Sequence, residues 1–451
     1  MSGGAIMTKT DYLQLLKEEL VEALGCTEPA CVALAAAHAR EQVVLALNDP
    51  SSGDFLNADQ IESVDLYCSV NIYKNAMGVY IPGTNDMGAA MAAALGVIAG
   101  KASRGLQVLE NISKLQIKEA RQLCKSDKVK LHPAPSCEPT LYAEAVVRAK
   151  GHTGRAVISW KHDMIVLLEQ DGKPTFQFCP EEQDLSGSIS EQDLTEIWDF
   201  VSSVDLDDLS IIREAIRLNE IIAEEGLSKS YGLEVGRAIL EKNKLPAFAK
   251  KSLGPAFSDY CAARTAAAAD ARMAGSTLPV MANSGSGNQG LTVTVSVTAA
   301  AKYLESSEEE LIRAQTLSQL VAIHIKQSFG RLSPLCGATA AAVGASAGMV
   351  MLLGGGLDHV IAAVQNMFGT VTGMICDGAK LGCALKVASC IYAAVQSALV
   401  AMRGKEIKHT DGVIEYDVEN TIQNMERISK EGMLHMDDLL LNIMLNKKQT
   451  P

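Results

Sequence analysis

The pattern of apolar and polar positions divides the chain into three stretches. Leucines at 13, 16, 20 and 24 share one face of an amphipathic helix, predicted from Thr10, as its N-cap, to about Gly25. A second helix, rich in alanine, is predicted from about Pro29 to Leu47. Positions 61 to about 179 predict strands and two helices, and the chain after about 186 predicts helices broken by glycine-rich segments.

The middle stretch alternates short β-type runs with helical periodicity. Its strands are predicted at 64–70, 78–81, 128–131, 141–147, 156–160 and 164–168, and its helices at 86–100 and 112–124. The acidic, serine-containing segment 181–191 is typical of a linker. We therefore predict an α+β fold: a predominantly helical, Ala/Gly-rich catalytic body with an inserted sheet-containing α/β lobe. The predicted division is 1–60, N-terminal helices packing with the helical body; 61–185, the α/β lobe; and 186–451, the helical domain.

Composition narrows the classes of protein that fit. Hydrophobic residues make up 48% of the 451 positions and aromatic residues only 4%, so the core consists mainly of small side chains. The net charge of −13, without a basic patch, argues against nucleic acid and anionic membranes as partners. Eleven cysteines, an odd number in a long chain without a signal-peptide pattern, indicate a reducing compartment, so we expect a cytoplasmic protein. The uncharged stretch 332–357 is long enough to span a bilayer, but its Gly, Ala and Ser content favours a buried helix.

The late cysteines are the strongest candidates for metal ligands. Six residues separate Cys376 from Cys383, among them Gly378 and Gly382, and glycine lets the backbone bring two sulfurs together. Cys336 lies upstream between a proline and a glycine. Three thiolates on a [4Fe–4S] cluster would leave one iron without a protein ligand. Equally, these residues can be ordinary buried thiols, since cysteine packs as a small hydrophobe.

An early cysteine lies at a predicted helix start. In Gly-Cys-Thr-Glu-Pro, residues 25–29, Thr27 is the predicted N-cap of the second helix. Cys26 would then sit beside free backbone amides and the positive end of the helix dipole, which lowers a thiol pKa. The resulting thiolate can act as a base, a nucleophile or a fourth metal ligand. A buried junction cysteine is the alternative.

Two further motifs are candidates for substrate binding. The run Asn283, Ser284, Gly285, Ser286, Gly287 and Asn288 alternates glycines with polar residues, so consecutive amides can form an anion nest. Without the Gly-Lys-Ser/Thr of a P-loop, it suits a small carboxylate better than a nucleotide, and a tight turn is the alternative. Lys74 and Asn75 follow a predicted strand, where Lys74 can pair with a substrate carboxylate or simply lie in a solvated turn.

Taken together, five ordered motifs resemble the L-cysteine desulfidase family, relatives of the iron–sulfur L-serine dehydratases. The motifs are Gly-Cys-Thr-Glu-Pro, Asn-x-x-Lys-Asn-x-Met-Gly, Ser-Gly-Ser-Gly-Asn-Gln-Gly, Ser-Pro-Leu-Cys-Gly-Ala and Cys-Asp-Gly-Ala-Lys-x-Gly-Cys, which begin at residues 25, 71, 284, 333 and 376. The resemblance implies a [4Fe–4S] cluster on Cys336, Cys376 and Cys383, and Cys26 as the base. The implied reaction eliminates sulfide from L-cysteine, giving pyruvate and ammonia without pyridoxal phosphate.

The resemblance leaves the substrate open between branches of these enzymes. Serine dehydratases space the last ligand pair more widely, and some end in a cysteine that reaches the cluster; this sequence ends Lys-Lys-Gln-Thr-Pro, which favours the desulfidase branch. The alternatives are an L-serine or L-threonine dehydratase, or a non-catalytic iron–sulfur sensor. We expect a small amino-acid substrate, no nucleic-acid or membrane partner, and leave the oligomeric state open, a homo-oligomer included.

Overall fold

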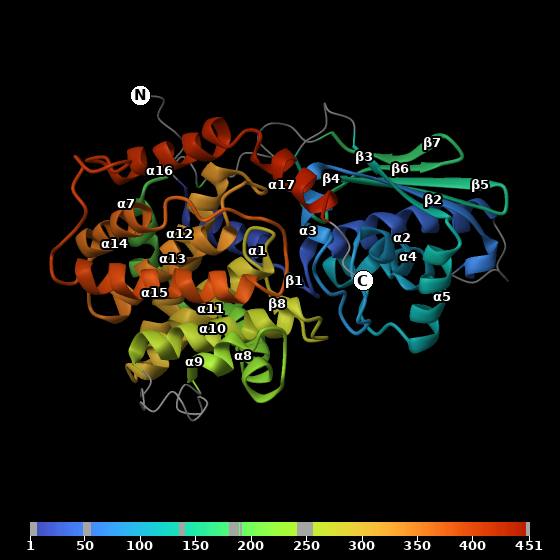
Figure 1. The fold of residues 1–451 in the computed structure, drawn as a ribbon. Coiled ribbons are helices and arrows are strands. Elements are labelled where there is room, and N and C mark those ends of the chain that lie inside the picture. The colour runs from blue at the N-terminus through green and yellow to red at the C-terminus, as the bar shows by residue number, and fades with distance from the viewer. Residues whose placement is uncertain are drawn as a thin grey trace.

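The fold consists of two lobes, a helical body and a smaller lobe built on a six-stranded sheet (Figure 1). The structure, a computed structural model, describes residues 7–47, 56–134, 140–179, 189, 192–240 and 256–447. Each lobe has its own apolar core. One core combines α1 (Lys9–Glu19) with the helices after residue 192, and the other combines the sheet with its covering helices. The predicted α+β fold is confirmed.

The sheet has the strand order β3-β2-β4-β5-β6-β7, in which β2 and β3 are parallel and the other neighbours antiparallel. Helices α2 and α4 cover one face, and α5 packs against α4 (Figure 1). The opposite face is hollowed over about 570 Å³ and lined by polar side chains that include Tyr67, Glu144 and Arg155. The elements of this lobe are α2 (Thr27–Leu47), β2 (Ile61–Cys68), α3 (Val70–Ala76), α4 (Ala89–Ala99), α5 (Lys114–Lys125), β3 (Val129–Pro133), β4 (Tyr142–Ala149), β5 (His152–Ser159), β6 (Ile165–Gln170) and β7 (Lys173–Gln177), with short 3₁₀ helices at Ala58–Gln60 and Ala102–Gln107.

The helical body packs through small residues. A methyl group placed on Gly344 of α13 would lie 2.4 Å from the carbonyl oxygen of Ser318 in α12, so these two helices approach more closely than larger side chains would allow. This agrees with the alanine-rich composition. The elements of the body are α1, α7 (Leu194–Ser203), α8 (Ser210–Ser228), α9 (Val235–Leu240), α10 (Phe257–Met273), α11 (Gly287–Tyr303), α12 (Glu308–Phe329), α13 (Gly337–Leu352), α14 (Leu357–Thr370), α15 (Cys383–Ala401) and α16 (Val418–Arg427), with a 3₁₀ turn at Leu206–Asp208 and a π-helical turn at Ile428–Gly432. The last helix, α17 (Met436–Leu445), packs against α3 of the sheet lobe.

The N-terminal segment differs from its prediction in two ways. Helix α1 begins two residues earlier, because Thr8 and Asp11 form a capping box, and it ends at Glu19. The following residues form β1 (Glu22–Ala23), which pairs with β8 (Val280–Met281) of the helical body. The apolar positions at 20 and 24 therefore belong to an extended segment.

Helix α2 also packs differently from the prediction. The sequence predicted that both N-terminal helices join the helical body, and α1 does. Helix α2 instead lies on the sheet and belongs to the core of that lobe. A methyl group on Gly96 of α4 would lie 2.2 Å from the carbonyl oxygen of Ala33 in α2, so the two helices are in close contact. The apolar, alanine-rich sequence of α2 fits either lobe, and periodicity alone did not distinguish them.

Several predicted elements in the sheet lobe need correction. The expected strand at 78–81 is absent, and Tyr80 makes only an isolated bridge to Met87. Helix α3 occupies 70–76, where we expected a loop, and β7 was not predicted because all its residues are exposed and it lacks an apolar face. Most of the predicted linker 181–191 lies outside the described residues.

Two helices, α2 and α15, are long and apolar enough to cross a membrane by length and composition. In the fold, however, 67% of the apolar window of α2 and 56% of that of α15 are buried, which is typical of core helices in a soluble protein. The uncharged stretch 332–357 contains α13, whose middle is buried in the helical core.

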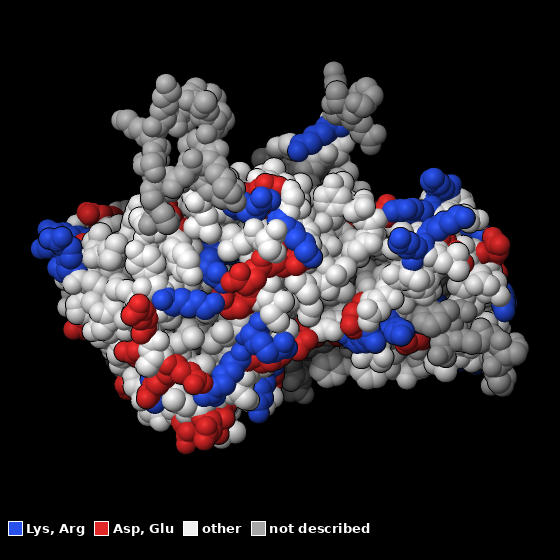
Figure 2. Space-filling model, turned by 90° about the horizontal axis from the view of Figure 1, so that it is seen from below, with Lys and Arg blue, Asp and Glu red and all other residues white. Residues whose placement is uncertain are grey.

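On the face shown in Figure 2, Lys and Arg side chains are interspersed with Asp and Glu.

Candidate active site

Two extended segments bring Cys336 and Cys376 side by side. The Cys336 amide donates a hydrogen bond to the Met374 carbonyl oxygen (2.9 Å), and the Cys376 amide donates to the Pro334 carbonyl oxygen (2.7 Å). An isolated antiparallel bridge between Leu335 and Ile375 completes the pairing. The two cysteines, 40 positions apart in the sequence, therefore lie on adjacent extended segments joined by this bridge.

Cys383 approaches the same place from the start of α15. Gly378 has φ +91°, which lets the chain turn back after Cys376, and the Cys383 sulfur lies 3.9 Å from the Gly378 carbonyl oxygen. The three thiols, hereafter the cysteine trio, are within electrostatic reach of one another. Burial raises the pKa of both Cys336 and Cys383, and the neighbouring Cys376 sulfur raises it further.

The trio is the candidate set of ligands for an iron–sulfur cluster. Among the described residues, no three His, Cys, Asp or Glu side chains are grouped as they would be around one metal ion. An iron–sulfur cluster, in contrast, takes its cysteine sulfurs at separate corners. All three thiols are half-buried and none forms a disulfide, so the donor set fits such a cluster. A fourth thiol, Cys390, lies nearby against the Met374 sulfur (3.5 Å) and interacts electrostatically with Cys336.

Cys26 meets the trio across the junction of the two lobes. Its carbonyl oxygen accepts the amide of Ala30, so Cys26 itself, rather than Thr27, is the N-cap of α2. It is 5% exposed and belongs to a small apolar cluster against which Cys383 packs. Although the two cysteines are distant in sequence, the fold brings them into one site.

The predicted lowering of the Cys26 pKa is wrong. Burial raises the pKa of this thiol well above its usual value, and the negative charge of Glu28 raises it further. The helix amide of Glu28 and the charge of Arg272 act in the opposite direction without reversing the shift. The thiol is therefore neutral near pH 7 and donates a hydrogen bond to Glu28 Oε2 over 2.9 Å.

Glu28 is at the centre of the polar part of the site. Its carboxylate accepts hydrogen bonds from Cys26, from Thr27 Oγ1 (3.2 Å) and from Asn75 Nδ2 (2.8 Å). Burial acts to raise its pKa, but the charge of His162 and the hydrogen bond from Cys26 lower it overall, so the carboxylate is ionised. The sequence analysis did not identify Glu28 as functional, although it lies in the first motif, three positions after a glycine and two after Cys26.

The glycine-rich run begins as a tight turn and becomes the start of α11. Ser284 and Gly285 have φ of 49° and 77°, and the Ser286 hydroxyl caps the helix by accepting the amide of Gln289 (3.3 Å). The side chain of Asn283 is buried and satisfied internally: its oxygen accepts hydrogen bonds from Ser284 and Gln289, and its amide donates to Gln319.

Arg272 connects this run to the Cys26 loop. Its guanidinium donates to the Gly25 carbonyl oxygen (3.1 Å) and to Asn288 Oδ1 (2.9 Å). Gly287 lies directly beneath it, since a methyl group there would be 2.4 Å from Arg272 Nε. The sequence analysis missed Arg272, which lies in an alanine-rich helix without a recognisable motif. Its buried charge is the signal that identifies it.

Three more buried polar side chains surround Glu28 and the trio. Lys74 donates to the Cys376 carbonyl oxygen (3.0 Å) and pairs with Asp437 of α17. His162 is 3% exposed and lies beside Gly285, and neither of its ring nitrogens has a hydrogen-bond partner among the described residues. Lys326 of α12 is 5% exposed, and burial lowers its pKa to about 8, while the sulfurs of Cys376 and Cys336 favour its charged form.

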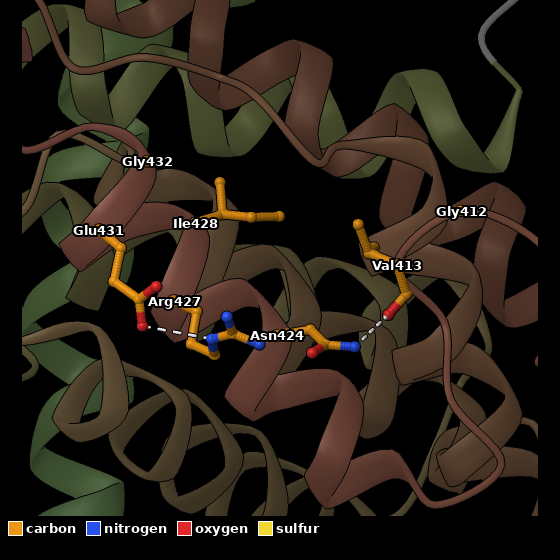
Figure 3. Close-up of a pocket in the computed structure, with 7 residues that line it drawn as sticks. All are labelled: Gly412, Val413, Asn424, Arg427, Ile428, Glu431 and Gly432. Atoms are coloured by element: carbon orange, nitrogen blue, oxygen red, sulfur yellow. Dashed lines mark hydrogen bonds and ion pairs between the residues drawn. The ribbon is translucent and has the colours of Figure 1, made fainter.

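A hollow of about 560 Å³ lies elsewhere, beside α16 (Figure 3). Two of its polar side chains, Arg427 and Glu431, pair with each other at 3.2 Å, and Asn424 donates to the Val413 carbonyl oxygen (3.1 Å). Its lining contains no cysteine or histidine. The chemistry-bearing residues therefore gather at the lobe junction and not in this hollow. The seven lining residues are Gly412, Val413, Asn424, Arg427, Ile428, Glu431 and Gly432.

Comparison with known proteins shows the family of this chain. The family described as serine dehydratase alpha chain matches residues 103–442. The chain belongs to the serine dehydratase alpha chain family. It is 45% identical over 441 residues to a UPF0597 protein of Oleidesulfovibrio alaskensis, covering 97% of this chain and 98% of that one. It is also 40% identical to a UPF0597 protein of Aeromonas hydrophila (98% and 97% covered) and 38% identical to one of Clostridium perfringens (97% and 98% covered).

The region matched to the serine dehydratase alpha chain family contains the trio, the glycine-rich run and Arg272, His162 and Lys326. Cys26, Glu28, Lys74 and Asn75 precede it, but the UPF0597 relatives extend over nearly the whole chain. The site therefore has two parts. One lies in the region matched to the family, and the other lies N-terminal to it, in a region that only the alignments with the UPF0597 relatives cover.

Proposed function

We propose that this protein is a [4Fe–4S]-dependent lyase, independent of pyridoxal phosphate, that eliminates sulfide from L-cysteine to give pyruvate and ammonia. One observation carries the proposal: the cysteine trio and the Cys26–Glu28 pair, from different lobes, lie in one buried site. Family membership supports a lyase. The free state of all described cysteines agrees with a reducing, cytoplasmic setting.

The trio would hold the cluster through Cys336, Cys376 and Cys383. When bound, such a cluster supplies an open iron that acts as a Lewis acid on the leaving group. The chain itself then has to bind the amino acid, move the α-proton and keep water away. The trio and Cys26 are at least half-buried, which limits access of water to the reacting atoms.

The Cys26–Glu28 pair is the proposed proton acceptor. A neutral thiol is not a base, so Cys26 can take the α-proton only after its own proton has passed to Glu28 along the 2.9 Å hydrogen bond. The ionised carboxylate of Glu28 and its hydrogen bond from Asn75 suit this transfer. Arg272 fixes the carbonyl of the preceding Gly25 and so orients the thiol.

The second candidate function is loss of water from L-serine or L-threonine. The family match favours this reaction, because the matching family is described as the serine dehydratase alpha chain. The two reactions share the α-proton transfer and differ in the leaving group. We assign the glycine-rich run, through the amides of Gly287 and Asn288 at the start of α11, to binding of the anionic part of either substrate.

The decisive experiment assays anaerobically purified protein for keto acids. Pyruvate is measured with L-cysteine and with L-serine, and 2-oxobutyrate with L-threonine, alongside sulfide release. Pyruvate and sulfide from cysteine at the higher kcat/KM supports the proposal, whereas a preference for serine or threonine establishes the second candidate. Protein that holds a cluster but forms no keto acid from any of the three is instead a sensor.

A further inference from the structure

One amide oxygen beside the cysteine trio is buried without a partner. Gln289, in the first turn of α11, is fully buried, and its Oε1 accepts no hydrogen bond from the residues that the structure describes. A buried acceptor without a donor is costly, because it has lost its hydrogen bonds to water. The Gln289 oxygen therefore calls for a donor that comes from outside the chain.

The neighbouring amides show that the free atom is an oxygen. Asn283 Nδ2 faces the backbone carbonyl oxygen of Gln319 (3.4 Å), which can only accept, and it also donates to Gln319 Oε1 (2.8 Å). Asn283 Oδ1 therefore points the other way and needs a donor, which is Gln289 Nε2 at 2.7 Å. Exchanging oxygen and nitrogen in Gln289 would set two acceptors against each other. This network fixes Oε1 as the free end of Gln289.

The free oxygen lies between two parts of the proposed site. A methyl group placed on Gly337 would be 3.3 Å from Gln289 Oε1, and Gly337 directly follows Cys336 of the trio. Gln289 itself directly follows Gly287 and Asn288, whose amides we assigned to the anionic part of the substrate. Gly337 has no side chain to fill the place next to the oxygen, so a small group can approach it there.

The position of Gln289, and not its burial alone, indicates a ligand. Gln315 of α12 is also fully buried, and its Oε1 likewise has no partner among the described residues. Its Nε2 donates to the Thr294 carbonyl oxygen (2.6 Å) and to Thr298 Oγ1 (2.9 Å). These partners belong to the middle of α11, whereas Gln289 belongs to its start. Gln315 is therefore a matched residue for comparison.

We propose that Gln289 Oε1 accepts a hydrogen bond from the α-amino group of the substrate. This inference rests on the proposed function, which supplies an amino acid as the substrate. The amino group and the carboxylate are bonded to the same α-carbon, so a carboxylate at the amides of Gly287 and Asn288 brings the amino group to the same turn of α11. Without an amino group, the buried oxygen stays unpaired, and the site therefore rejects acids that lack this group.

The test compares two ligands that differ in the amino group. L-Alanine has no leaving group and cannot be eliminated, and propionate is the same acid without its amino group. Their dissociation constants are measured anaerobically with cluster-containing wild type, Gln289→Met, Gln289→Glu and Gln315→Met. Wild type should bind L-alanine more tightly than propionate. In Gln289→Met we expect L-alanine to bind about 30-fold more weakly, with propionate unchanged.

The other two variants separate loss of the acceptor from a general effect on the fold. Gln289→Glu keeps a carboxyl oxygen in place of Oε1 and, because burial favours the protonated acid, an O–H for Asn283, so the preference for L-alanine should return. Gln315→Met is the matched control and should bind both ligands like wild type. Circular dichroism and the visible absorbance of the cluster show whether each variant is folded and loaded.

The outcomes separate this inference from the proposed reaction. If wild type has no preference for L-alanine, or if Gln289→Met keeps it, the amino-group role is wrong and a buried water alone satisfies the oxygen. Equal weakening of both ligands, or the same loss in Gln315→Met, also contradicts the role. If Gln289→Met alone loses the preference but wild type releases no keto acid from cysteine, serine or threonine, the amino-group site stands and the proposed reaction fails.

Discussion

Replacing Gly287 by alanine tests the link between the glycine-rich run and the Cys26 loop. The new methyl group would lie 2.4 Å from Arg272 Nε and 2.5 Å from its Cζ, whereas ordinary contact begins at 3.4 Å. The guanidinium must therefore move by about 1 Å, since close-packed interiors absorb such overlap by displacement. That movement breaks or lengthens its hydrogen bonds to Gly25 and Asn288.

The contacts of Gly287 give the expected size of the loss in stability and in turnover for Gly287→Ala. Overpacking costs about 1–3 kcal/mol, and weakening hydrogen bonds from a buried charge adds roughly 1.5–3 kcal/mol. We expect a net loss of about 3 kcal/mol in the free energy of unfolding, seen as a Tm lower by roughly 3 °C for a chain of 451 residues. Because Arg272 orients the loop that carries Cys26, a shift of about 1 Å should also lower kcat/KM about 100-fold.

The assay measures thermal unfolding and pyruvate release for wild type, Gly287→Ala and a control, Gly373→Ala. A methyl group at Gly373 meets no atom within 4 Å, so the control should match wild type. If Gly287→Ala keeps both the wild-type Tm and the wild-type kcat/KM, Arg272 does not connect the two loops and the reasoning is wrong. A lower Tm with unchanged turnover would limit Arg272 to a structural role.

Three further predictions address the thiols, the C-terminal helix and pH. Cys26→Ala should abolish turnover and keep the visible absorbance of the cluster, whereas Cys376→Ala should lose both; loss of iron from Cys26→Ala would make Cys26 a fourth ligand. Asp437→Asn removes the counter-charge of a lysine that is 1% exposed, so we expect about 3 kcal/mol lower stability in thermal or urea unfolding; an unchanged midpoint contradicts this. Burial opposes the charged form of His324, but its hydrogen bond to Glu419 raises its pKa overall from 6.5. That stabilisation is complete below pH 6.5 and is lost as pH rises through the raised pKa, so the wild-type Tm should fall over this range and the Tm of Glu419→Gln should not.

Local signals in the sequence predicted much of the sheet lobe. The strands β2 to β6 and the helices α4 and α5 were predicted close to where they lie. In α5 the buried residues Ile117, Ala120 and Leu123 recur at helical spacing, whereas α4 and β4 are buried almost throughout and stand out as apolar runs. β7 has no buried face and left no such pattern. The predicted end of α1 was wrong because apolar residues beyond Glu19 continue the spacing while belonging to β1 and its surroundings.

The motifs predicted the location of the site residues better than the role of each residue. Cys26 was placed correctly beside a helix start. Its pKa, however, depends on burial and on the charge of Glu28, and both follow from the tertiary structure. Arg272 and Lys326 could not be found from the sequence, because a cation within an apolar helix has no pattern that reveals which groups it contacts.

The division of the site between lobes constrains how it can work. Cys26 and Glu28 belong to α2, which packs on the sheet, whereas the trio belongs to the helical body. Lys74 from α3 of the sheet lobe crosses the junction to the Cys376 carbonyl oxygen, and Asp437 of α17 binds the same amino group. Any movement between the lobes would therefore change the distance from the proton acceptor to the trio and strain these contacts together. The buried Lys74–Asp437 pair, which is costly unless both partners stay in place, makes a fixed junction the more stable arrangement.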